Sequence, residues 1–218
     1  VIIERLAYKP LRQASSLAVL ITAIGVSYFL QNLALLIWGS AAKIFPTILD
    51  YGSINLFNDQ LKLSYQMLIT ITVCIVIMIL LNLFIKKTKI GKAMRACSED
   101  KEAAALMGIN VDNIISLTFA IGSGLAAVAA LLLCAAYPTV TPTLGSMPGI
   151  KAFTAAVIGG IGSIPGALLG GLLLGVIEII VKAYGLSELT DAIAFGVLIL
   201  VLLFKPTGLL GKKVKEKV

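Results

Sequence analysis

The 218 residues carry a net charge of +7, but only 13% of them are charged, 59% are hydrophobic and the mean hydropathy is +1.01. Soluble domains average about 25% charged residues, so long apolar runs in a chain of this composition indicate that lipid is its solvent. The basic residues flank the apolar runs, which argues against nucleic-acid binding. The chain has no histidine and three scattered cysteines, which argues against a metal site and a disulfide framework.

The opening VIIERLAYKPLRQ lacks both an initiator Met and the pattern of a signal peptide. We expect it to be a loop that leads into the first membrane span. We also expect the chain to be an N-terminally truncated fragment of a permease domain, lacking earlier spans.

Apolar runs long enough to cross a bilayer follow in chain order, because a spanning helix needs about 20 such residues. They occupy residues 16–38, 64–85, 114–137 and 189–204. A longer tract, 149–184, is interrupted by GGIGSIPG. It is either a half-helix followed by a full span or two short spans joined by a Gly-Pro turn. The predicted fold is an all-α, polytopic transmembrane bundle of about five to six spans, forming a single domain over residues 1–218.

The orientation in the membrane follows from Lys and Arg, which accumulate in cytoplasmic segments. Most of the 18 basic residues lie in the opening up to residue 15, in the loop 86–113 and in the tail from residue 205. Residues 137–149 contain none. We therefore expect a multi-pass protein of the plasma (inner) membrane, with its start, the 86–113 loop and its C-terminal tail in the cytoplasm.

The sequence SEDKEAAALMGIN, residues 98–110, predicts a short amphipathic helix within that cytoplasmic loop. Ser98 can cap its start, Ala103, Leu106 and Met107 share one face, and Gly108 suits the position just past its end. Such a face of small residues fits a groove on another protein. The alternative is an ordinary capped loop helix.

Cys97 lies one residue before the expected cap, beside Arg95 and Lys101, which should favour the reactive thiolate. We expect a thiol reagent to label it, whereas Cys74 and Cys134 should be shielded within apolar runs.

Three stretches resemble the permease subunits of ABC importers for branched-chain amino acids. They are KAMRACSEDKEAAALMGINVDNIISLTFAIGSGLAAVAALL, GIKAFTAAVIGGIGSIPGALLGGLLLGVIE and AIAFGVLILVLLFKPTGLLG, and the likeness covers about residues 86–211. The resemblance implies that the loop carries the coupling helix, which docks on the ATP-hydrolysing subunit. It places that contact at Glu99, Asp100, Glu102, Ala103, Ala104, Leu106 and Gly108.

The same resemblance implies a transport function with several partners. These are a second permease subunit, two cytoplasmic ATPase subunits and an extracytoplasmic solute-binding protein, within membrane lipid. The substrate would be a branched-chain or similar small amino acid, although relatives of this kind also carry urea and short amides. The sequence lacks the G-x-x-x-x-G-K-[ST] and G-x-G-x-x-G motifs. ATP must therefore be bound by a partner, and we expect the chain to be no enzyme and to hold no cofactor.

Gly162, Gly166 and Gly170 are four residues apart, so a helix would carry them on one face. Small residues at this spacing let a neighbouring backbone approach closely. We interpret them as helix-packing positions.

Glu178 is the one carboxylate deep in an apolar run, in GVIEIIVKAYG. Such residues are costly in lipid and raise a functional hypothesis. Lys182, four residues further on, is a possible ion-pair partner on the same helix face. We expect Glu178 to be structural and to pair either with Lys182 or with a neighbouring helix. If Glu178 instead exchanges protons in a cavity, the chain would be a proton-coupled secondary transporter, which is the alternative function.

Overall fold

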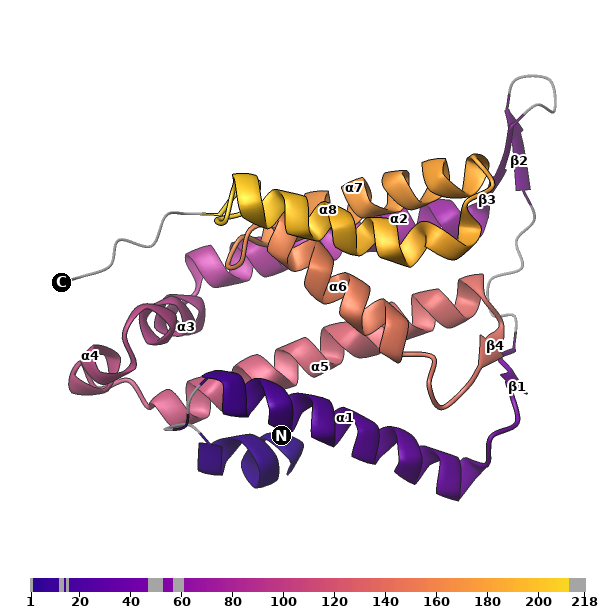
Figure 1. The fold of residues 1–218 in the computed structure, drawn as a ribbon. Coiled ribbons are helices and arrows are strands. Elements are labelled where there is room, and N and C mark those ends of the chain that lie inside the picture. The colour runs from indigo at the N-terminus through magenta and orange to yellow at the C-terminus, as the bar shows by residue number, and fades with distance from the viewer. Residues whose placement is uncertain (1, 12–13, 15, 47–52, 57–60, 212–218) are drawn as a thin grey trace. The chain divides into compact units, whose positions relative to one another are not determined.

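The computed structural model describes residues 2–11, 14, 16–46, 53–56 and 61–211, and helices dominate it (Figure 1). The α-helices are α1 (Ser16–Trp38), α2 (Tyr65–Lys87), α3 (Lys89–Glu99), α4 (Lys101–Leu106), α5 (Val111–Ala136), α6 (Ser146–Gly159), α7 (Ile164–Ala183) and α8 (Thr190–Phe204). The chain divides into two compact units. One contains Val1–Val76 and Leu83–Leu144, and the other contains Ile77–Asn82 and Gly145–Val218.

Five helices of the described residues are long and apolar enough to cross a membrane, which confirms the predicted helical bundle. Four are α1, α2, α5 and α7, and the fifth is Ser187–Phe204, which includes α8. The interrupted tract becomes α6 followed by α7. With 14 residues, α6 is about 21 Å long, short of the roughly 30 Å apolar core of a bilayer. The half-helix alternative is therefore the one that the structure adopts.

Short strands, which the sequence analysis did not predict, lie in the loops of the first unit. β1 (Lys43–Ile44) pairs antiparallel with β4 (Thr139–Val140), and β2 (Ser53–Leu56) pairs with β3 (Leu61–Ser64) as a hairpin. The β1–β4 pair joins the chain that follows α1 to the chain that follows α5. The ends of these two spans are thereby fixed at the same side of the unit.

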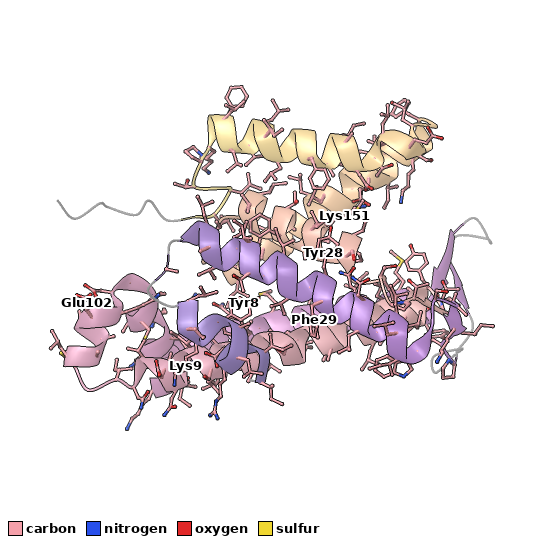
Figure 2. The ribbon with its side chains drawn as sticks, turned by 60° about the horizontal axis from the view of Figure 1, so that its bottom comes forward. Tyr8, Lys9, Tyr28, Phe29, Glu102 and Lys151 are labelled. Carbon is pink, nitrogen blue, oxygen red and sulfur yellow. The ribbon has the colours of Figure 1, made fainter. Side chains whose placement is uncertain are left out.

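The opening segment was expected to be a loop, and that expectation is wrong. It forms a π-helical turn, Glu4–Tyr8, and a 3₁₀ turn, Lys9–Leu11. Ser116 donates a 2.7 Å hydrogen bond to the buried Glu4 carboxylate, and the Tyr8 ring lies 5.0 Å from that of Phe119. Lys9 reaches Asp112 at 3.2 Å (Figure 2). The segment folds because α5 offers these partners, which local sequence cannot reveal.

The second unit contains a small apolar core where α6, α7 and α8 meet. Ala155 and Ile158 of α6, Leu174 of α7 and Ala194 of α8 are buried there, and the α8 side chains Val197, Leu198 and Val201 pack against them. In contrast, many large apolar side chains of the spans are exposed, as expected for helices that cross a membrane.

Candidate functional site

The polar loop between α2 and α5 begins with a sharp corner at Thr88. The Thr88 hydroxyl donates to the carbonyl of Phe84 at the end of α2 and accepts from the N–H of Gly91 in the first turn of α3. A Cβ at Gly91 would overlap the backbone of Ile85. One threonine therefore serves both helix ends, and only glycine lets α3 start so close to α2.

The loop contains two helices where we predicted one. Ser98 and Glu99 belong to the end of α3, so the prediction that Ser98 caps the second helix is wrong. The cap of α4 is Asp100, whose carboxylate accepts hydrogen bonds from the N–H groups of Glu102 and Ala103 at 2.9 and 3.0 Å. A carboxylate is the stronger cap because its charge also meets the positive end of the helix. Gly108, with φ of +80°, follows the end of α4 as predicted.

The surface of α4 is unusually apolar for an exposed helix. Leu106 and Met107 are 89% and 83% exposed, and Ala103 and Glu102 are exposed beside them (Figure 2). Ala104 faces the opposite way and is buried, so it cannot contact a partner in this conformation. Of the residues expected to dock, Ala104 faces inward and the others are exposed. Glu99 lies on the neighbouring helix α3. We call Glu102, Ala103, Leu106 and Met107 the α4 face.

Cys97 does not lie in an open polar loop. It occupies the last part of α3 and is buried, with only 7% of its surface exposed. The expectation that it is the accessible thiol of the chain is therefore wrong. The sequence analysis missed α3, whose polar and apolar residues form an amphipathic pattern that buries Cys97.

α6 and α7 cross at backbone contact distance. A Cβ on Gly166 would overlap the carbonyl oxygen of Gly159, and one on Gly170 would overlap that of Ala155. Each helix thus contributes two small residues four apart, which supports the packing role inferred for Gly166 and Gly170. Gly162 differs, because it lies in the turn with φ of +88° and a Cβ there would meet no described atom within 4 Å. Its requirement for glycine is conformational.

The chain after α8 closes the interrupted end of α6. The N–H groups of Leu209 and Leu210 donate to the carbonyls of Ile158 and Gly159 at 2.8 and 2.9 Å. Helix ends leave such carbonyls without intrahelical partners, which is costly away from water. The FKPTGLLG sequence therefore completes the turn between α6 and α7. Sequence reasoning found both motifs but had no signal that they meet.

A three-charge cluster lies toward the other end of the same helices. The Lys151 ammonium of α6 is 2.9 Å from the Glu178 carboxylate of α7 and 2.8 Å from that of Asp191, the second residue of α8 (Figure 2 labels Lys151). Of the two partners predicted for Glu178, the neighbouring helix is the one that the structure provides, through Lys151. Lys182 is exposed.

The sequence of the chain is similar to those of known transport proteins. Residues 2–202 match the family described as branched-chain amino acid transport system / permease component. The chain is 50% identical to the high-affinity branched-chain amino acid transport system permease protein BraD of Pseudomonas aeruginosa, over 99% of this chain and 71% of that protein. It is 46% identical to the LivH permease proteins of Salmonella typhimurium and Escherichia coli, with the same coverage. No solved structure matches the chain.

Proposed function

Since this chain belongs to the branched-chain amino acid transport system permease family, we propose that it is a permease subunit of an ATP-driven importer for branched-chain or similar small amino acids. The similarity to named permeases of such systems over 99% of the chain carries the proposal. The five candidate spans provide the membrane domain that this function needs.

The proposed orientation places α3, α4 and the tail in the cytoplasm and the β1–β4 pair outside. The lysines of the 86–113 loop and of the tail support this orientation. α5 then runs outward and α8 runs inward. α6 enters from outside, and the turn at Gly160 to Ser163 lies with the tail toward the cytoplasm, because the tail hydrogen-bonds to the end of α6.

The α4 face is the proposed contact with a cytoplasmic ATPase subunit. Leu106 and Met107 supply exposed apolar area, and Glu102 supplies a charge at its edge. Burying such side chains in a partner's groove is favourable by about 25 cal/mol per Å² of apolar area. Because α4 joins α3 to α5 through short turns, a displaced ATPase would move these helices with it. The full assembly would contain a second permease, two ATPases and an extracytoplasmic solute-binding protein.

Proton-coupled secondary transport is the alternative, and the cluster around Glu178 speaks against it. The Glu178 carboxylate is held in an ion pair with the Lys151 ammonium at 2.9 Å, as expected for a structural charge between packed helices. An exposed apolar docking helix would also have no purpose in a transporter without an ATPase.

Reconstitution of the complete transporter tests the proposal. Proteoliposomes with ATP inside and the solute-binding protein outside are expected to accumulate radiolabelled leucine. A protonophore should leave the accumulation unchanged, and replacing ATP by a non-hydrolysable analogue should abolish it. Accumulation that survives without hydrolysable ATP but collapses with the protonophore would establish the secondary-transporter alternative.

A further inference from the structure

We propose that Lys151, Glu178 and Asp191 form a transient binding site for the charged groups of a zwitterionic amino acid. The inference rests on the proposed function and adds to it a place where the substrate's ammonium and carboxylate are recognised within the membrane domain.

The composition of the cluster is the first argument. One ammonium lies within 2.9 Å of two carboxylates, so the three side chains together carry a formal charge of −1. Ion pairing alone would need only one carboxylate for Lys151. The second carboxylate gives the cluster an acceptor for a further ammonium group, while Lys151 remains a donor for a carboxylate.

The second argument is the cost of breaking ion pairs. Removing one partner from a sheltered ion pair is unfavourable, because a charge is left without compensation. A zwitterion avoids this cost. The substrate carboxylate can replace Glu178 or Asp191 at the Lys151 ammonium. The substrate ammonium can then pair with the cluster carboxylate that Lys151 has released. Every charge stays paired, whereas a substrate that carries only a carboxylate would displace a cluster carboxylate and bring no ammonium to pair with it.

Accessibility and position are the third argument. The Lys151, Glu178 and Asp191 side chains are 29%, 18% and 40% exposed, so the cluster is sheltered but open to a solute. Its residues come from the second turn of α6, the last third of α7 and the first turn of α8. In the proposed orientation this end faces outward, where a solute-binding protein would release the substrate.

The way in which α6 is held indicates what the exchange of ion pairs at Lys151 would do to this helix. At its C-terminal end the half-helix is held by backbone hydrogen bonds from Leu209 and Leu210, and in its middle by the close contact of Ala155 with Gly170. One turn before Ala155, Lys151 connects α6 to α7 and α8 through its ion pairs with Glu178 and Asp191. Substrate charges that replace these contacts would loosen the outer end of α6 and leave the inner end in place.

Ligand binding to the purified transporter, assembled without the solute-binding protein, tests the site. The probes are leucine, its cationic amide leucinamide and the anion 4-methylpentanoate, which share one side chain and differ in charge. Their affinities are measured by saturation-transfer difference NMR. Each charge-assisted hydrogen bond contributes roughly 1.5–3 kcal/mol, so leucine should bind at least about tenfold more tightly than 4-methylpentanoate, which brings no ammonium. Leucinamide keeps the ammonium and should also bind more tightly than 4-methylpentanoate.

The decisive variant is Lys151→Met with Glu178→Gln and Asp191→Asn, which removes all three charges together and leaves none unpaired. The preference for leucine should disappear in it. The matched control, Lys182→Met with Glu188→Gln, changes exposed charges nearby and should retain the preference. Equal binding of leucine and 4-methylpentanoate by the unmodified transporter, or a preference for leucine over 4-methylpentanoate that persists in the triple variant, would overturn the inference. Failure of the proposed function is distinct, because it would abolish ATP-dependent leucine import by the unmodified transporter.

Discussion

The backbone N–H of Leu209 donates a hydrogen bond of 2.8 Å to the carbonyl oxygen of Ile158, the last residue but one of the half-helix α6. The two residues are 51 positions apart in the chain, and the bond ties the segment after α8 to the turn between α6 and α7. Gly208 makes this approach possible, since its φ is +74° and a Cβ on it would lie 2.5 Å from both the nitrogen and the Cα of Gly160.

Gly208→Ala should therefore separate the tail from the turn. A left-handed conformation costs a non-glycine residue about 1–2 kcal/mol, and the contact with Gly160 adds to that cost. We expect a lower melting temperature of the detergent-solubilised protein. Gly196→Ala in α8 is the control, because a Cβ there meets no described atom within 4 Å and alanine favours the helix. Equal melting temperatures for the two variants would show that the tail contact contributes nothing to stability.

Gly170→Ala tests the close crossing of α6 and α7. Its Cβ would overlap the carbonyl oxygen of Ala155, and overpacking of this kind typically costs about 1–3 kcal/mol. Gly175→Ala on the same helix lies in open space and is the matched control. Thermal unfolding followed by far-UV circular dichroism should show a loss for the first variant alone. If Gly170→Ala unfolds like its control, α6 and α7 do not need backbone contact.

Asp100→Ala tests the cap of α4. The variant loses both side-chain hydrogen bonds to the N–H groups of Glu102 and Ala103, at a cost of about 1 kcal/mol. Amide hydrogen exchange of residues 101–106 should accelerate roughly fivefold, the factor that corresponds to this free energy. Ser98→Ala, at an exposed site on α3, should leave their exchange unchanged. Faster exchange in the Ser98 variant instead would return the capping role to that residue.

Features that depend on residues close together in the sequence could be predicted, whereas features that depend on distant segments could not. The spans could be predicted because each depends on its own run of about 20 apolar residues, and α1 matches its predicted bounds of 16–38. The prediction that Gly108 follows the end of a helix was correct for the same reason, since a helix end is a local feature. The cap was misplaced by two residues because Ser98 and Asp100 both suit the position, and only the presence of α3 decides between them.

The candidate site required tertiary information. Lys182 was the only basic partner of Glu178 visible within one helix, whereas Lys151 comes from another helix, 27 residues earlier. Asp191 gave no signal, because it lies at a helix start where acidic residues are common. The meeting of the tail with α6 was likewise invisible, since hydrogen bonds between backbone groups leave no trace in side-chain patterns.

The α4 face is the proposed contact with the ATPase subunit. Labelling of a single cysteine on this face tests that contact most directly. Met107 is 83% exposed, so Met107→Cys in a Cys74→Ala background should react with a membrane-impermeant maleimide, while the buried Cys97 and Cys134 react slowly. We expect labelling from the cytoplasmic side of inside-out vesicles only, and protection when the ATPase subunits are bound. Tyr184→Cys, an exposed position at the end of α7 that faces outward in the proposed orientation, should be labelled only from outside, and the ATPase subunits should not protect it. Labelling of Met107→Cys from outside, or labelling that the ATPases leave unchanged, would contradict the assignment of this chain's coupling surface.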